Sequence, residues 1–323
     1  MFLQKFDELE RIVIQCHDSP DADSIGAGYA LYVYFKEKGK DVHLVYSGVN
    51  RITKPGLRMM VEKMEIPVKY VEELPACDVL ITVDCQYEGG NITRFDTPLA
   101  AMVDHHPSCV PTNDWCYIKS EYGSCCTVVW LLLTEAGFDV NKNTDVATAL
   151  YYGLYSDTGQ LSEIYCASDR EMRETLRIDR ELFKMVVNSN LSREELQIAG
   201  EALTNYYYNE QLYFAVVKTR PCDPNLLGVI SDMVIQVAGI DVCVVYNETP
   251  IGYKLSIRSG KQPYEASHLA ESIAADVGSG GGHMNKAGGF VHREMLTTQY
   301  KGQAFSNILR KRIESYILKA REG

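Results

Sequence analysis

Short apolar runs separated by helical patterns fill the first half of the chain. The runs are rich in Val, Ile and Leu and are bounded by turn residues, which is typical of buried strands, and they lie at residues 12–16, 42–46, 79–84 and 99–104. Between the first two runs, apolar side chains recur at helical spacing at Ile25, Tyr29, Tyr32 and Phe35, and Gly39 follows as a stop signal. Strand, helix and strand in succession predict a parallel sheet.

The pattern becomes helical from Gly123 onward and mixed in the last third of the chain. Apolar residues recur at spacings of three and four in the segments 128–136, 145–155 and 169–203. Strand patterns return at 212–217, 242–246 and 253–257, with helix faces at 227–237 and 305–313. The sequence therefore predicts an α/β protein with a parallel-sheet domain at 1–190 that carries helices on both faces, a helical linker at 191–208 and a smaller mixed α/β domain at 209–323.

Composition and charge narrow the class of protein. The 323 residues are 46% hydrophobic and 23% charged, which is typical of a globular protein of two domains. Lys and Arg number 32 against 43 Asp and Glu, so the net charge is −11 and the chain lacks the positive field that binds long nucleic acids. Short anionic substrates remain compatible with this charge if positive side chains are concentrated locally.

Cysteine use and hydropathy favour a cytoplasmic protein. The ten cysteines form no C-x-x-C pair, which indicates free thiols in a reducing compartment. No export signal is evident and no run approaches the roughly 18 apolar residues of a membrane helix, so no membrane partner is expected. The oligomeric state stays open, with a homodimer as one arrangement.

Side chains able to bind metal ions follow several of the predicted strands. The strands at 12–16, 79–84 and 99–104 lead into or end in His17, Asp21, Asp23, Asp84, Asp104, His105 and His106. Because the carboxyl ends of neighbouring parallel strands meet at one edge of a sheet, we expect these groups to converge. Asp157, at the end of the apolar run 149–155, is expected to join them.

Four of these acids set the expected metal content. Asp21, Asp23, Asp84 and Asp157 carry four negative charges, which two divalent cations would neutralise. Carboxylates mixed with imidazoles favour Mn²⁺ over Ca²⁺, and the lack of a thiolate among the expected ligands disfavours a zinc cage. Taken alone, Asp21 and Asp23 are also compatible with helix-capping acids in front of Ser24.

Five short motifs occur in an order that is found in a known family. In chain order they are H-D-S-P-D-A-D, V-D, V-D-H-H, S-D-T-G and G-G-G-H-M-N-K-A-G-G, and they span His17 to Gly289. This order resembles the DHH phosphoesterases that carry a DHHA1 domain. Within that superfamily the chain is most similar, in its length and in having no extra domains, to the bifunctional oligoribonuclease and pAp phosphatase group.

The resemblance implies two Mn²⁺ ions and a role for each residue of the predicted site. The implied ligands are His17 and Asp21 for one ion, Asp23, His105 and Asp157 for the other, and Asp84 as a bridge between them. Asp104 would orient an imidazole and His106 would contact the scissile phosphate, so Asp84, Asp104 and His106 are the expected catalytic residues. Such a pair of ions permits in-line attack by water without a protein nucleophile.

The second domain is expected to hold the substrate, with the reaction in the cleft between the domains. Glycine runs let backbone N–H groups approach an anion, and Arg258 at a strand end can fork onto a phosphate or stack on a base. Both features resemble the substrate-binding face of DHHA1 domains, although Arg258 is also compatible with a surface ion pair. The expected substrate-binding residues are His106, Arg258, Ser259, Gly280, Gly281, Gly282 and His283.

The sequence thus predicts a Mn²⁺-dependent phosphoesterase for short nucleotide substrates: pAp, dinucleotides or RNA fragments of a few residues. Hydrolysis of cyclic dinucleotides is the alternative within this class, and a non-catalytic nucleotide-binding protein is the alternative outside it. A processive exonuclease and an inorganic pyrophosphatase are less favoured, because the first usually needs further nucleic-acid-binding domains and the second lacks the glycine-rich segment. Departures from the family pattern at residues 85–87 and 160–162 spare the predicted ligands and put substrate preference in doubt.

Overall fold

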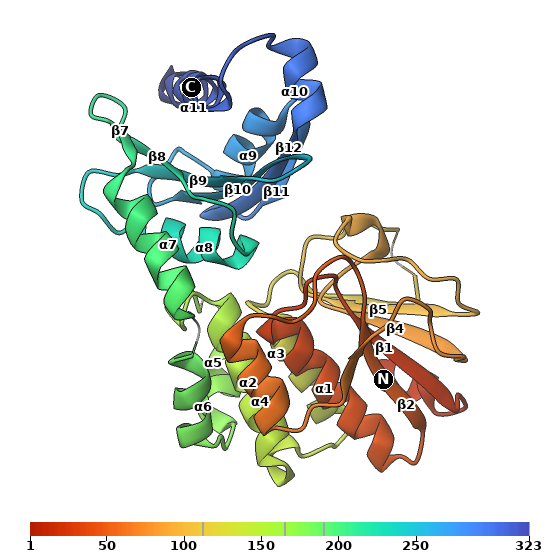
Figure 1. Ribbon diagram of the computed structural model, residues 1–323. Coiled ribbons are helices and arrows are strands. Elements are labelled where there is room, and N and C mark those ends of the chain that lie inside the picture. The colour runs from red at the N-terminus through yellow and green to blue at the C-terminus, as the bar shows by residue number, and fades with distance from the viewer. Residues whose placement is uncertain (112, 165, 190, 323) are drawn as a thin grey trace. The chain divides into compact units, whose positions relative to one another are not determined.

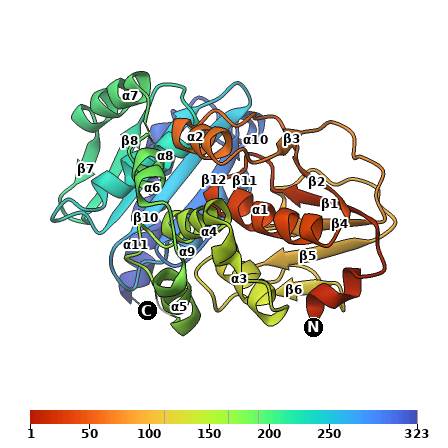
Figure 2. The same ribbon diagram turned by 90° about the horizontal axis from the view of Figure 1, so that it is seen from below.

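The computed structural model describes residues 1–111, 113–164, 166–189 and 191–322 of a chain that divides into two compact units, Met1–Leu191 and Ser192–Gly323. Each unit has its own sheet and its own hydrophobic core (Figures 1 and 2). Sheets flanked by helices confirm the predicted α/β class. In the described part of the chain, no helix has the length and apolar character needed to cross a membrane.

Six parallel strands form the sheet of the first unit, in the order β3-β2-β1-β4-β5-β6. They are β1 (Arg11–Cys16), β2 (Asp41–Tyr46), β3 (Val68–Tyr70), β4 (Val79–Val83), β5 (Ala100–Asp104) and β6 (Cys116–Ile118). The four longer strands coincide with the predicted apolar runs, whereas β3 and β6 are only three residues long and give no pattern. The strand order reverses direction between β1 and β4, and such a switch point is where α/β sheets bind ligands.

The α-helices of the first unit pack on one face of this sheet, where the expectation was helices on both. A single buried cluster joins the strands to α1 (Ala22–Glu37), α2 (Pro55–Lys63), α3 (Cys125–Glu135), α4 (Thr144–Asp157), α5 (Ala167–Thr175) and α6 (Arg180–Val187). The opposite face carries a smaller cluster that includes Val13, Val45 and Leu80 and is covered by loop residues. The physical reason is that the described connections after β3 and β4 contain no α-helix.

Close packing of α1 against α3 and α4 brings the ends of these helices to the sheet edge. A Cβ atom at Gly26 of α1 would lie 2.7 Å from the carbonyl oxygen of Ala149 in α4. A Cβ atom at Gly153 of α4 would lie 2.3 Å from Cys126 Sγ in α3. Because real side chains do not approach so closely, glycine at both positions lets the three helices converge.

The second unit contains a mixed six-stranded sheet in the order β11-β12-β10-β9-β8-β7. The strands are β7 (Tyr207–Asn209), β8 (Phe214–Lys218), β9 (Val242–Glu248), β10 (Gly252–Ser259), β11 (Gly278–Gly282) and β12 (Lys286–His292). Among the described strand pairs of this sheet, β8–β9 is parallel and the others are antiparallel. Along β8, Ala215 and Val217 belong to one core cluster, while Phe214 and Val216 belong to the other, as alternation along a strand requires.

Helices cover both faces of the second sheet. On one face lie α7 (Arg193–Thr204) and α8 (Pro224–Val234), and on the other lie α9 (Ala266–Ala274) and α11 (Phe305–Glu322), with α10 (Arg293–Gln299) after β12. Most of the expected helical linker, 191–208, is α7, which packs on α8 and β8 and so belongs to the second unit by its contacts.

Candidate metal centre

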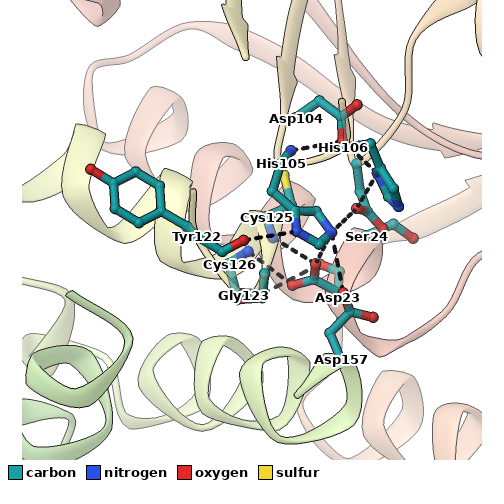
Figure 3. Close-up of polar contacts among 12 residues, drawn as sticks. Asp23, Ser24, Asp104, His105, His106, Tyr122, Gly123, Cys125, Cys126 and Asp157 are labelled. Atoms are coloured by element: carbon teal, nitrogen blue, oxygen red, sulfur yellow. Dashed lines mark hydrogen bonds and ion pairs between the residues drawn. The ribbon is translucent and has the colours of Figure 1, made fainter. Parts of the chain in front are cut away.

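The carboxyl ends of β1, β4 and β5 lie next to one another and bring the predicted metal ligands together. His17, Asp84 and His105 directly follow these three strands, which are neighbours in the sheet. Helix ends supply the other donors, since Asp21 is the N-cap of α1, Asp23 lies in its first turn and Asp157 is the last residue of α4. Figure 3 shows Asp23, His105 and Asp157 pointing toward one another.

Asp84 lies between two groups of donors. Its Oδ2 atom is 3.5 Å from His17 Nε2, and its Oδ1 atom is 3.4 Å from His105 Nε2. The residue is buried, with 3% of its surface exposed, and its φ angle of 61° falls in the left-handed region. Asp tolerates this region better than most residues, and strained backbone of this kind clusters at functional sites.

The first donor group consists of His17, Asp21 and Asp84. His17 Nδ1 lies 2.9 Å from the carbonyl oxygen of Asp18, so Nδ1–H donates there and Nε2 faces the two carboxylates. Asp21 Oδ1 accepts hydrogen bonds of 3.0 Å from the backbone N–H groups of Asp23 and Ser24. Helix capping and metal binding are therefore compatible in Asp21, because its carboxylate has two oxygens.

The second donor group consists of Asp23, His105 and Asp157. His105 Nε2 lies 3.1 Å from Asp157 Oδ2 and 3.8 Å from Asp23 Oδ2, while its Nδ1 faces the carbonyl oxygen of Tyr122 at 3.2 Å. The two oxygens of Asp23 accept hydrogen bonds from the first N–H groups of α3, at Cys125 (2.6 Å) and Cys126 (2.8 Å) (Figure 3). The α3 N-terminus thus stabilises a carboxylate that is fully buried.

The carboxylates and imidazoles shift one another's pKa values. Burial, together with the charges of Asp84 and Asp157, raises the pKa of Asp23 well above its usual value. Burial alone would lower the pKa of His105, but the nearby Asp157 and Asp84 carboxylates raise it well above its usual value. Such crowding of negative charge around buried atoms is a site that a cation would stabilise.

Two buried atoms of the donor groups lack a hydrogen-bond partner, which is compatible with a bound cation. In the part of the chain that the structure describes, neither Asp84 Oδ1 nor His105 Nε2 makes a hydrogen bond of acceptable geometry. A buried polar atom without a partner costs about 1–3 kcal/mol, which a divalent cation shared by both atoms would offset. Burial raises the pKa of the nearby Cys125 and Cys126 thiols, so they stay protonated and the donors are oxygen and nitrogen, as Mn²⁺ accepts.

Asp104 holds His106 at the rim of the site. Its Oδ1 atom accepts hydrogen bonds from His106 Nδ1 at 2.9 Å and from the His105 backbone N–H at 2.8 Å. Burial would raise the pKa of Asp104, but the His106 hydrogen bond lowers it to about 2. Because His106 Nδ1 is used by Asp104, we do not count it as a metal ligand despite its distance of 3.7 Å from Asp84 Oδ1.

Gln86 is a part of the site that the sequence did not reveal. Its Nε2 atom donates to Asp104 Oδ2 at 2.6 Å, and its Oε1 atom accepts from the Cys109 backbone N–H at 2.8 Å. The side chain is buried, with 2% exposed. In the sequence, Gln86 stands out only as a departure from the family pattern. Its role is not visible there because its partners lie 18 and 23 residues further along the chain.

The predicted substrate-binding residues of the second unit are largely occupied by contacts within that unit. Arg258 Nε donates to Asp232 Oδ1 at 2.6 Å, so the ion pair considered from the sequence is present. Ser259 is buried, and its hydroxyl donates to the carbonyl oxygen of Tyr264, so its one donor is already used. Ser259 as a substrate-binding residue stays a prediction.

The glycine run forms a strand where the sequence suggested an anion cradle. Gly280, Gly281 and Gly282 belong to the edge strand β11, and His283 begins the turn into β12. A Cβ atom at Gly280 would lie 2.5 Å from the carbonyl oxygen of Ala270, so this glycine serves the close packing of β11 on α9. Whether the run also binds substrate stays a prediction.

Comparison with known proteins identifies the first unit. Residues 11–154 match the family described as DHH family, N-terminal domain. Residues 11–154 are a DHH-family N-terminal domain. The match contains five of the six predicted metal ligands, with Asp157 just beyond it, and confirms the resemblance noted from the motifs.

Three relatives are between 23% and 29% identical to this chain over the aligned segments. An uncharacterized protein of Methanocaldococcus jannaschii is 23% identical over 327 residues, which cover 98% of this chain and 66% of that protein. The bifunctional oligoribonuclease and PAP phosphatase NrnA of Mycoplasma genitalium is 25% identical over 226 residues, which cover 65% of this chain and 67% of that protein. A probable manganese-dependent inorganic pyrophosphatase of Streptococcus mutans is 29% identical over 173 residues, which cover 52% of this chain and 55% of that protein.

A solved structure shares the fold over nearly the whole chain. The crystal structure of an exopolyphosphatase-related protein from Bacteroides fragilis superposes with a TM-score of 0.73 at 18% identity and covers 99% of this chain and 96% of that one. The chain spans about two thirds of the length of the first two relatives and about half of the third. The DHH-family domain and its fold are thus established, while the substrate is a matter for proposal.

Proposed function

We propose that the chain is a Mn²⁺-dependent phosphoesterase that hydrolyses short nucleotide substrates such as pAp, dinucleotides and RNA fragments of a few residues. The observation that carries this proposal is the position of Asp84, with one oxygen 3.5 Å from His17 Nε2 and the other 3.4 Å from His105 Nε2. A carboxylate that presents one oxygen to each of two donor groups is suited to bridge two cations.

The residues of the site divide the chemical work. A bound pair of divalent cations would lower the pKa of a water molecule and neutralise charge on a phosphoryl group. Asp104 fixes the His106 ring through Nδ1, and 40% of the His106 side chain is exposed, so its ring can contact a phosphate at the rim. The ligands for the cations are His17, Asp21, Asp23, Asp84, His105 and Asp157.

Charge and relatives support a short nucleotide substrate. The net charge of −11 opposes the approach of long polyanions. The relative from Mycoplasma genitalium is named for oligoribonuclease and PAP phosphatase activity, and the Streptococcus mutans relative is named for manganese dependence. Both names agree with a Mn²⁺ phosphoesterase that acts on small substrates.

A substrate panel tests the proposal directly. Release of phosphate or mononucleotide is measured from pAp, a dinucleotide, a long RNA, a cyclic dinucleotide and pyrophosphate, each with Mn²⁺ and with a chelator. We expect metal-dependent turnover of pAp or the linear dinucleotide, at least tenfold faster than turnover of the long RNA. Preferred hydrolysis of pyrophosphate or of the cyclic dinucleotide would contradict the proposed substrate class, and no metal-dependent turnover at all would contradict the activity.

A matched pair of substitutions isolates the bridging carboxylate. Asp84 follows strand β4 and Asp78 precedes it, so Asp84→Asn and Asp78→Asn remove the same charge from opposite ends of one strand. Asp78 accepts hydrogen bonds from the side chain and backbone of Arg11, away from the donor groups. We expect Asp84→Asn to lower kcat by at least a thousandfold and Asp78→Asn to change it less than threefold. Wild-type turnover in the Asp84 variant would overturn the bridging role.

A further inference from the structure

One row of side chains crosses the sheet of the second unit next to helix α8. Lys254 on β10 lies directly opposite Asn247 on β9 and Phe290 on β12, so the three side chains share a face of the sheet. Two residues along β10, the Ser256 hydroxyl lies 2.9 Å from that of Ser231 in α8, which fixes this as the α8 face. The row therefore borders α8.

Lys254 is a half-buried cation without a partner. Throughout the part of the chain that the structure describes, its ammonium group forms neither an ion pair nor a hydrogen bond. Arg258, on the same face of the same strand, is compensated by Asp232 at 2.6 Å. Burial lowers the pKa of Lys254, because it disfavours the charged form. An uncompensated buried cation is stabilised when an anion binds beside it.

Asn247 adds a buried acceptor to the row. Its side chain is only 2% exposed, and its Nδ2 atom donates to the Cys222 carbonyl oxygen at 3.0 Å. Its Oδ1 atom is buried and, among the described residues, receives no hydrogen bond. Buried polar atoms are rarely left unpaired, so Oδ1 is suited to a donor that a ligand brings.

Phe290 adds a flat apolar surface at the other end of the row. Its ring is half-buried and meets the His292 ring edge-to-face, with centroids 5.0 Å apart. A Cβ atom at Gly252, the first residue of β10, would lie 2.9 Å from this ring, so the glycine leaves room for it. An aromatic ring beside a cation is the combination that holds a base and a phosphate in many nucleotide sites.

We propose that Asn247, Lys254 and Phe290 bind one nucleotide unit of the substrate, with a phosphate on Lys254, the base against Phe290 and an N–H or O–H group on Asn247 Oδ1. This inference rests on the proposed function, since it names the part of the substrate that the second unit recognises. It also moves the main phosphate contact from Arg258, whose charge is already neutralised, to Lys254.

Binding of AMP to the full chain, measured by calorimetry in the presence of a chelator, tests this site without relying on turnover. Lys254→Met keeps the long aliphatic stem and removes the charge, so we expect AMP affinity to fall about tenfold, as for loss of one charged hydrogen bond. Lys254→Arg, which keeps the charge, is expected to retain most of the affinity. Lys261→Met is the matched control, because Lys261 is exposed on the same unit and pairs with Asp241, and it is expected to change nothing.

The outcomes separate this inference from the proposed function. Wild-type AMP affinity in a folded Lys254→Met chain would overturn the inference, whatever the activity assays give. Inorganic phosphate serves as the second probe, and its binding as tightly as AMP would overturn the base contact with Phe290. Loss of turnover in Asp84→Asn tests the proposed function alone, since AMP binding is measured without metal.

Discussion

At the scale of single residues, the Asp104 carboxylate is held from two sides. Its Oδ1 atom faces His106 Nδ1 and the His105 backbone N–H, while its Oδ2 atom receives a 2.6 Å hydrogen bond from Gln86. A carboxylate with every contact in place keeps the neighbouring imidazole in one orientation and one tautomer. The orientation of His106 therefore depends on a glutamine that is not itself one of the predicted metal ligands.

Gln86→Leu tests this positioning role. The substitution keeps the volume of the side chain but leaves Asp104 Oδ2 and the Cys109 N–H without a partner. We expect the free energy of unfolding to fall by about 1–3 kcal/mol, from chemical denaturation, and kcat to fall more than KM changes. Gln197→Leu, on the exposed face of α7, is the control and should leave both unchanged. An unaltered kcat in Gln86→Leu would contradict the positioning role of Gln86.

At the scale of elements, the packing of helix α4 against α1 and α3 determines how far apart the donors of the second group lie. Gly153 of α4 faces Cys126 of α3, and its missing Cβ would also lie 3.0 Å from the Cα atom of Asp23. Since α4 ends at Asp157 and α1 begins beside Asp21, the distance between these helices determines the width of the second donor group.

Two glycine substitutions in helices should have opposite effects. Gly153→Ala forces atoms into a packed crossing and is expected to lower the free energy of unfolding by about 1–3 kcal/mol and to weaken Mn²⁺ binding. Gly200→Ala, in α7, meets nothing within 4 Å and is expected to raise stability by about 0.5–1 kcal/mol, because alanine favours the helix. Thermal unfolding with and without Mn²⁺ measures both effects, and equal stabilisation by the two substitutions would contradict the described crossing.

Sequence patterns predicted the elements that carry many apolar residues and missed those that carry few. β1 and β4 were predicted because burial of nearly all of their residues makes them rich in Val, Ile and Leu. β11 was missed because its sequence is Gly-Ser-Gly-Gly-Gly, which has no side chains to form an alternating pattern. His17, Asp84 and His105 were predicted because they directly follow apolar strands. The partners of Gln86 and the burial of Asn247 Oδ1 depend on contacts that only the fold creates.

At the scale of the whole molecule, the proposed metal centre and the proposed nucleotide site lie in different units, each with its own sheet. The DHH-family domain supplies the acids and imidazoles of the proposed metal centre. The second unit supplies the cation of the proposed nucleotide site, although the chain as a whole carries a net charge of −11. A local positive group within an acidic protein selects for short anions, because long polyanions also meet the repulsive remainder of the surface.

Counting the manganese bound per chain tests the central claim most directly. Protein dialysed to equilibrium against Mn²⁺ is assayed by plasma mass spectrometry, for the wild type, Asp84→Asn and the control Asp78→Asn. The account predicts two ions per chain for the wild type and for Asp78→Asn, and at most one for Asp84→Asn, because the shared ligand is lost. A wild-type chain that retained no more manganese than Asp84→Asn would contradict a bridged pair of cations at the ends of β1, β4 and β5.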